Sequence, residues 1–350
     1  MEAPPEPDLA RAPMGELERA AAARLSGMVH GYYATGARTE RTLRENEAAW
    51  DAWWLRPRRL TGVADISLST TLLGRPVAHP VIVGPSAGHA MAHPDGELAT
   101  ARAVTALGGT LVLSTSSNLS VEEVAAVPGL DLWFQLYPFE DRSLTEGLVR
   151  RAVGAGARAI VRTVDVTSEA DTHARPVGGF VDPPLPWAHH DGRSAILRHL
   201  DWPYARWLAD LAGVPVVLKG ILHPDDVARA ADEGFAGVIV SNHGGRTVDG
   251  LMPTALALPG CAAAAAGRLE VYVDGGIRLG GHVLRALALG ARAVLVARPI
   301  LWGLALGGEA GARVVLERLL RELAEDMAFA DVADVTALPA DLLVPAQPLP

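Results

Sequence analysis

The sequence predicts an α/β fold, a parallel (β/α)8 TIM barrel preceded by a helical segment. Eight short apolar runs, rich in β-branched residues, alternate after residue 80 with segments rich in Ala, Leu and Arg. The chain has 350 residues and is 49% hydrophobic, which fits one large α/β domain with a sizeable core. Polar side chains follow nearly every apolar run, and the carboxyl ends of the strands are where such a barrel places its chemistry.

The segment before the barrel strands is predicted to contain a helix and a hairpin. Residues 1–15 are rich in Pro and Ala and are expected to be flexible, whereas residues 16–33 show an amphipathic helical pattern. Residues 66–72 and 77–79 are strand-like and flank a Gly-Arg turn, so they predict a hairpin that caps one end of the barrel. Three tryptophans precede this hairpin: Trp50, Trp53 and Trp54. Their acidic neighbours favour core packing over a platform for stacked bases.

The barrel domain is predicted over residues 16–330. Its strands are expected at residues 81–83, 110–113, 132–136, 159–164, 216–219, 237–240, 271–273 and 293–296. Helices are expected at residues 96–107, 121–127, 144–155, 204–212, 224–231, 255–266, 282–289 and 309–329. A doubly wound open sheet is the alternative, but the loop after the first strand lacks the G-x-G-x-x-G spacing of that fold.

The composition limits the classes of binding partner and the cellular compartment to be expected. The formal net charge of −9 does not favour nucleic acid or an anionic membrane surface. The only cysteine, Cys261, excludes an intrachain disulfide and favours the cytoplasm, and its Ala-rich surroundings predict a core position. We find no signal-peptide pattern and no apolar run long enough to span a membrane. Residues 331–350 are Pro-rich and are expected to have little regular structure.

The connection after the fourth strand, residues 165–202, is longer than the others. Long loops at this end of a barrel are typical of lids or binding loops. His189 and His190 are adjacent in it, without partners at metal-ligand spacing. We therefore predict solvated loop histidines and no metal site.

The strongest candidate active site follows the sixth strand, where Ser241, His243 and Arg246 surround two glycines. A base and a fixed cation at the carboxyl end of a buried strand favour catalysis over a plain turn. Further polar or turn residues follow the earlier strands: Pro85, Ser86, Ala87, Ser114, Gln135, Tyr137, Thr163, Asp165 and Lys219. Helix capping explains single residues such as Ser114 or Ser241, but it does not explain their recurrence at nearly every strand end.

The last two strand ends predict a phosphate site. The residues concerned are Asp274, Gly275, Gly276, Arg278, Ala297 and Arg298. Barrels bind phosphate after strands seven and eight, where glycines allow close approach and arginines add charge. Lys219, at the end of a buried strand, requires as its partner either an internal Asp or an anionic group of a cofactor.

These residues resemble the FMN-dependent α-hydroxy-acid oxidases and dehydrogenases over about residues 16–329. The most specific matches are Ser-Asn-His-Gly-Gly-Arg-Thr-Val-Asp-Gly at residues 241–250 and Asp-Gly-Gly-Ile-Arg at residues 274–278. Supporting matches lie at residues 32–37, 91–97, 134–137, 163–165, 217–220 and 286–291. Matches in this number and order are not expected by chance.

The resemblance implies FMN as the cofactor and a role for each matching residue. His243 would be the base that takes a proton from the substrate, with Asp165 stabilising its charged form. Arg246 would bind the substrate carboxylate or a developing oxyanion, while Tyr32 and Tyr137 would orient the substrate. The other matching residues would hold the cofactor: Lys219, Ser114, Gln135, Thr163, Ser241 and the backbone at Pro85, Ser86 and Ala87 for the ring and ribityl chain, and Asp274, Gly275, Gly276, Arg278, Ala297 and Arg298 for the ribityl chain and phosphate.

One position departs from the family pattern. The family usually has a substrate-binding arginine after the fourth strand, and Thr172 stands in its place. Either His173 or Arg175 supplies the missing charge, or the substrate is not a simple hydroxy carboxylate. Asp171 favours the second possibility because it adds a like charge. Ser116 stands where the family often has a bulky pocket aromatic.

The sequence therefore predicts an FMN-dependent oxidoreductase that converts an α-hydroxy acid, or a related hydroxyl-bearing substrate, to the keto product. Its electron acceptor is O2 or another small molecule. The alternative is an FMN-dependent tailoring oxidase for a bulkier, non-carboxylate or amine substrate derived from a natural product or peptide. A flavin-binding scaffold without turnover is a third hypothesis, against which His243, Asp165 and Arg246 argue. The resemblance also implies a homo-oligomer, with a homotetramer favoured.

Overall fold

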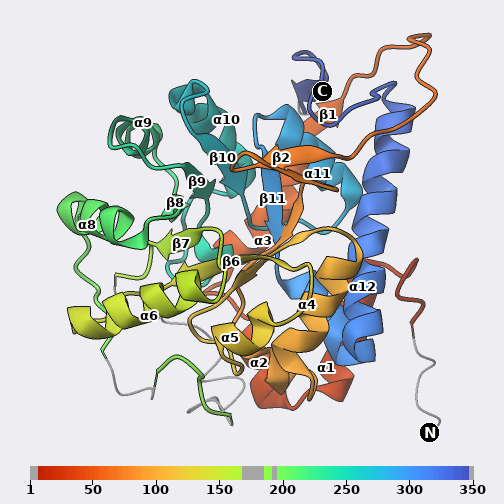
Figure 1. The fold of residues 1–350 in the computed structure, drawn as a ribbon. Coiled ribbons are helices and arrows are strands. Elements are labelled where there is room, and N and C mark those ends of the chain that lie inside the picture. The colour runs from red at the N-terminus through yellow and green to blue at the C-terminus, as the bar shows by residue number, and fades with distance from the viewer. Residues whose placement is uncertain (1–6, 168–184, 191–194, 347–350) are drawn as a thin grey trace, which may run out of the picture.

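The computed structural model describes residues 7–167, 185–190 and 195–346, and in these it forms a closed barrel of eight parallel strands (Figure 1). The strands follow one another around the barrel in chain order from β4 to β11, and β11 pairs with β4 to close it. Helices cover the outside of the barrel. The predicted (β/α)8 barrel is confirmed, and the open sheet is wrong.

The strands lie where the apolar runs predicted them: β4 (Val81–Val83), β5 (Thr110–Leu113), β6 (Asp131–Leu136), β7 (Ile160–Thr163), β8 (Val216–Ile221), β9 (Gly237–Val240), β10 (Glu270–Val273) and β11 (Ala293–Val296). The helices between them are α4 (Gly96–Ala106), α5 (Val121–Ala125), α6 (Arg142–Gly154), α8 (Trp202–Ala212), α9 (Pro224–Asp232), α10 (Thr254–Ala265) and α11 (Gly280–Ala288). Cys261 in α10 is buried, as predicted. Among the described helices, none combines the length and the apolar character needed to cross a bilayer.

A β-hairpin closes one end of the barrel. It consists of β2 (Thr70–Leu72) and β3 (Arg75–Val77), at the predicted place but shorter. Leu72 and Val77 pack into the barrel interior with side chains from all eight strands, among them Ile82, Val112, Trp133, Val161, Val217, Ile239, Tyr272 and Leu295. Arg158, just before β7, donates to the carbonyl of Leu72, so the hairpin covers the amino ends of the strands. The carboxyl ends remain free to form a site.

The N-terminal segment differs from the prediction. Three helices and a short 3-10 turn precede the hairpin: α1 (Met14–Arg24), α2 (Gly27–Ala34), α3 (Arg41–Ala48) and η1 (Ala49–Ala52). The single helix predicted over residues 16–33 is wrong, because Ser26 is extended and its hydroxyl caps α2 by accepting from the Val29 N–H. Trp50 is fully buried, which confirms core packing, but Trp54 is 51% exposed.

Helix α12 (Arg298–Phe329) begins directly after β11 and not at Glu309 as predicted. The early start places Arg298 in its first turn. The helix is interrupted at Gly308, whose φ of 58° suits glycine and where a Cβ would lie 2.8 Å from His93 Nε2.

The described residues 331–346 have little regular structure, as expected, except for one short strand. Strand β12 (Leu343–Pro345) pairs antiparallel with β1 (Trp53–Leu55), and Leu342 is buried just before it. The partner strand lies almost 300 positions earlier in the chain, so no local pattern in the tail indicates the pairing.

Two buried histidines predict how stability depends on pH. Burial lowers the pKa of both His79 and His282 to about 4. Between about pH 6.5 and pH 4 the unfolded chain therefore binds more protons than the folded chain, so stability falls as the pH is lowered, by up to about 1.4 kcal/mol per pH unit for each histidine. Urea unfolding at several pH values should show this slope. His79→Gln should reduce the slope, whereas substitution of the exposed His223 should not; an equal slope in all three proteins would contradict the account.

Candidate active site

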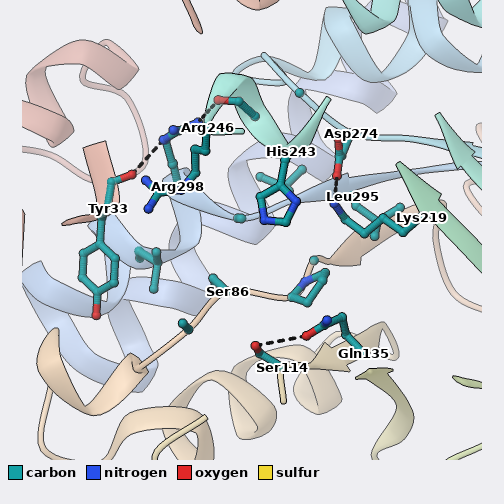
Figure 2. Close-up of a pocket in the computed structure, with 18 of the residues that line it drawn as sticks. Tyr33, Ser86, Ser114, Gln135, Lys219, His243, Arg246, Asp274, Leu295 and Arg298 are labelled. Atoms are coloured by element: carbon teal, nitrogen blue, oxygen red, sulfur yellow. Dashed lines mark hydrogen bonds and ion pairs between the residues drawn. The ribbon is translucent and has the colours of Figure 1, made fainter. Parts of the chain in front are cut away.

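A pocket lies at the carboxyl ends of the barrel strands, opposite the hairpin (Figure 2). All of the predicted site residues line it except Asp165 and Ser241. These two lie behind the lining residues: Asp165 is hydrogen-bonded to His243, and Ser241 is hydrogen-bonded to Lys219. The sequence therefore predicted which side chains converge, although they come from every part of the barrel.

His243 is held between a carboxylate and a phenol. Its Nδ1 lies 3.0 Å from Asp165 Oδ1, and its Nε2 lies 3.3 Å from the Tyr137 hydroxyl. Burial alone would raise the pKa of Asp165, but the charge and hydrogen bond of His243 and the charge of Lys219 together lower it. Gly220 makes room for this carboxylate, because a Cβ there would lie 2.6 Å from the Asp165 side chain. An ionised Asp165 therefore fixes the ring and leaves Nε2 facing the pocket.

Arg246 is anchored to the N-terminal segment. Its guanidinium donates to the carbonyls of Tyr32 (2.6 Å) and Thr35 (3.0 Å) and lies 5.2 Å from the centre of the Tyr32 ring. These carbonyls are at the end of α2, so the N-terminal helices form one wall of the site. This arrangement holds a fixed cation beside the base.

Positive charge is concentrated beside the turn after β10. Arg298 donates to the carbonyls of Tyr33, Gly244 and Thr35, and no carboxylate pairs with it among the described residues (Figure 2). Burial lowers the pKa of Arg298, and repulsion from Arg246 and Arg278 lowers it further. A bound anion would relieve this repulsion. Arg298 also begins α12, and the positive end of the helix dipole at this position favours a bound anion.

Two glycines shape the turn beside these arginines. Gly275 and Gly276 have φ values of 90° and 75°, and a Cβ on Gly276 would lie 1.9 Å from the Asn46 carbonyl oxygen. Asn46 exchanges two side-chain hydrogen bonds of 2.8 and 2.7 Å with Asn242, next to the base. Trp50 donates to the Gly275 carbonyl at 2.9 Å. Sequence reasoning missed Asn46 and Trp50 as supports of the site, because a buried amide or indole leaves no periodic signal.

Lys219 is buried with two partners. Its ammonium lies 3.0 Å from Asp274 Oδ2 and donates to Ser241 Oγ at 3.0 Å. Burial would lower the pKa of Lys219, but the charges of Asp274 and Asp165 raise it, so the cation persists. This confirms the internal Asp partner. Ser241 serves Lys219 and the N–H of His243, so it is not a helix cap.

Gln135 organises the polar wall opposite the base. Its carbonyl oxygen accepts from the Ser114 hydroxyl at 3.2 Å, and its amide nitrogen donates to the Thr163 hydroxyl at 3.0 Å. The pocket thus offers polar groups on one side and arginines with glycines on the other. That donor set fits an isoalloxazine ring and a phosphate, and the buried, unpartnered Asp274 Oδ1 is placed to accept from a ribityl hydroxyl.

Other predictions have mixed outcomes. His189 is not solvated: it is half-buried, its Nε2 accepts from the Val121 N–H at 2.9 Å, and its ring meets Phe134 edge-on. The described residues contain no cluster of side chains suited to a metal ion. Thr172, His173 and Arg175 lie outside the described residues.

A closed (β/α)8 barrel that gathers a histidine, several arginines and a glycine turn at its carboxyl end has the framework of a barrel enzyme that binds a phosphate-bearing cofactor. Residues 21–345 match the family model described as FMN-dependent dehydrogenase, and the chain belongs to this family. It is therefore an FMN-dependent oxidoreductase of the class that oxidises CH–OH donors.

Named relatives cover nearly the whole chain. An L-lactate oxidase from Nostoc sp. is 43% identical over 90% of this chain and 93% of its own length. Human 2-hydroxyacid oxidase 1 is 40% identical over 94% of this chain and 95% of its own length. The crystal structure of mandelate oxidase with (S)-4-hydroxymandelic acid has a TM-score of 0.90 at 40% identity and covers 95% of this chain and 98% of that one.

The Gly276 contact predicts a loss of cofactor binding. In Gly276→Ala the new methyl group would collide with Asn46 backbone, so the turn must move away from the arginines. We expect FMN affinity to fall at least tenfold, about 1.4 kcal/mol. Gly250→Ala is the matched control, since its φ of 86° is equally unsuited to Ala but no atom lies within 4 Å. Equal FMN affinities in the two variants would contradict a role of the Gly276 turn in binding FMN.

Proposed function

We propose that the chain oxidises a small α-hydroxy acid to the corresponding keto acid and passes the electrons to O2. The observation that carries this proposal is the His243 imidazole, held by Asp165 and facing the same pocket as Tyr137 and Arg246. The names of the relatives, which are oxidases of lactate and other 2-hydroxy acids, support the same chemistry. The tailoring alternative rests on Thr172, and none of the comparisons favours it.

His243 Nε2 is the atom that takes the proton. Its Nδ1 is committed to Asp165, so the neutral ring presents Nε2 as an acceptor. The ionised Asp165 then stabilises the imidazolium that forms. This role is the same whether the proton leaves the hydroxyl or the carbon of the substrate. Overall the substrate loses two electrons and two protons.

Arg246 and the two tyrosines orient the substrate. Arg246 binds the carboxylate or developing negative charge, and its ties to the carbonyls of Tyr32 and Thr35 keep it in place. Burial raises the pKa of Tyr137 and of Tyr32, so both phenols remain hydrogen-bond donors at neutral pH. Tyr137, already near His243, is placed to hold the substrate oxygen beside the base.

Bound FMN supplies the two-electron acceptor. The ring would lie against the polar wall and Lys219, whose persistent charge favours an electron-rich reduced ring. The phosphate would lie at the glycine turn with Arg278 and Arg298. The residues proposed to hold the cofactor are Pro85, Ser86, Ala87, Ser114, Gln135, Thr163, Lys219, Ser241, Asp274, Gly275, Gly276, Arg278, Ala297 and Arg298.

We also propose a homo-oligomer, a tetramer, in the cytoplasm. Exposed apolar side chains after β9 and on α10 support association: Val248, Met252 and Leu256 are each about half exposed. The free thiol of Cys261 supports a reducing compartment, although some relatives are named as peroxisomal. Light scattering of the purified protein tests the assembly.

Product analysis tests the proposed reaction. The holoenzyme is incubated in air with glycolate, L-lactate, (S)-mandelate and methyl (S)-mandelate, and keto product and consumed O2 are measured. We expect one keto acid formed per O2 consumed with at least one of the acids, and a much slower reaction with the uncharged ester. An ester oxidised as fast as its acid would overturn the carboxylate role of Arg246.

A further inference from the structure

A buried histidine lies directly behind one wall of the pocket. His89 belongs to a short 3-10 turn after β4 (η2, His89–Met91) and is 3% exposed. Its Nε2 lies 2.7 Å from Ser86 Oγ, and its Nδ1 lies 2.8 Å from Thr100 Oγ1 on α4. Ser86 lines the pocket (Figure 2). His89 and Thr100 are not among the residues that line it. His89 therefore acts on the pocket only through Ser86.

The His89 ring is neutral at neutral pH. Burial lowers its pKa, and the charge of Glu97 only partly opposes this effect. Glu97 directs Oε1 at the backbone N–H groups of His89 and Asn118 and makes no hydrogen bond to the ring. A neutral imidazole has one donor and one acceptor nitrogen, so Ser86 and Thr100 must play opposite roles.

Thr100 decides which nitrogen carries the hydrogen. Its hydroxyl is fully buried, and among the described residues its only partner is His89 Nδ1. Thr105 on the same helix instead donates to the Ala101 carbonyl at 2.8 Å. A buried hydroxyl hydrogen without an acceptor is unfavourable, so Thr100 donates to Nδ1. The hydrogen of His89 then lies on Nε2 and is donated to Ser86 Oγ.

The hydrogen of the Ser86 hydroxyl consequently remains available for donation to another group. In the described residues Ser86 Oγ has no hydrogen-bond partner except His89, which already donates to it. We propose that His89 is a positioning residue that fixes the Ser86 hydroxyl as a hydrogen-bond donor into the cofactor pocket. The inference rests on the proposed placement of the flavin ring against Ser86. A donor at that position stabilises the electron-rich reduced ring and raises its midpoint potential.

Nitrogen-15 NMR of the FMN-loaded protein labelled at histidine tests the first half of the proposal. His89→Gln identifies the resonances of His89 by their loss. We expect the neutral Nε2–H tautomer at about pH 7, since burial keeps the ring uncharged and Thr100 donates to Nδ1. The Nδ1–H tautomer would make Ser86 the donor to His89 and would overturn the proposal, and so would a charged ring.

The midpoint potential of the bound FMN tests the second half. Ser86→Ala removes the donor and should shift the reduction equilibrium at least tenfold toward oxidised flavin, which is about 30 mV for a two-electron couple. Thr105→Val, which removes a hydroxyl that serves only its own helix, should leave the potential unchanged. A Ser86→Ala potential equal to that of the wild type would overturn the proposal. Neither readout uses a substrate, so both stand independently of the proposed reaction.

Discussion

Replacing His243 by Asn is expected to slow the reduction of bound flavin by substrate about 10²- to 10⁴-fold, the range for loss of a general base. The amide cannot take up the proton, although it can keep one hydrogen bond to Asp165 or Tyr137. Stopped-flow absorbance under anaerobic conditions measures this step directly. The flavin content and visible spectrum should stay close to those of the wild type, because no phosphate-site residue has changed.

Asp165→Asn separates the role of the base from that of its partner. The Asn side chain keeps the shape of Asp but removes the charge that stabilises the imidazolium. We therefore expect the rate of flavin reduction to fall about 10²-fold, less than the largest loss expected for His243→Asn. Combining both substitutions should add little to the loss caused by His243→Asn, since the two groups act as one unit. A double variant slowed by the product of the single effects would show that Asp165 works independently of His243.

Replacing Arg278 by Ala is expected to weaken FMN binding by one to three orders of magnitude, about 1.4–4 kcal/mol. The guanidinium forms an ion pair of 2.5 Å with Glu47, and Arg278 lines the same pocket as Arg298. Titration of apoprotein with FMN, followed by flavin fluorescence, measures the affinity. Riboflavin, which has no phosphate, should bind the variant and the wild type about equally.

Arg298→Lys tests the second arginine proposed to bind the FMN phosphate. It disturbs the fold less than Ala would, because Arg298 also donates to three backbone carbonyls. Lys keeps the charge but lacks the planar fork, so we expect an intermediate loss of FMN affinity. Arg321→Ala is the control: this exposed arginine on the same helix pairs with Glu325, four residues later, and should have no effect. A riboflavin affinity that falls as much as the FMN affinity would show that these arginines shape the pocket and do not bind phosphate.

The barrel was predictable because its information is local. Each strand is buried on both faces and is therefore a continuous apolar run, and each polar strand end stands out against it. His243, Lys219 and Arg298 were identified in this way, without knowledge of which side chains they face. The hairpin was predicted from its turn for the same reason.

What the sequence did not reveal depends on contacts between distant segments. Asn46 bonds to Asn242, 196 positions away, and Trp50 bonds to the Gly275 carbonyl, 225 positions away. No periodic pattern in the sequence indicates either contact. Strand β12 exists only because β1 offers it unpaired backbone groups. The break between α1 and α2 lies at Ser26, whose hydroxyl caps α2. The amphipathic pattern continues across this residue, so it does not indicate the break. The proposed His89 tautomer depends on the partners Ser86 and Thr100, which only the folded chain brings together.

The most direct test of the account is anaerobic titration of the purified, FMN-loaded enzyme with 2-hydroxy acids, followed by visible absorbance. The account predicts that glycolate, L-lactate or (S)-mandelate bleaches the flavin bands at once in the wild type and only slowly in His243→Asn. A wild-type flavin that none of these acids reduces would contradict the proposed reaction. Equal bleaching rates in the wild type and His243→Asn would contradict the central role of the His243–Asp165 pair.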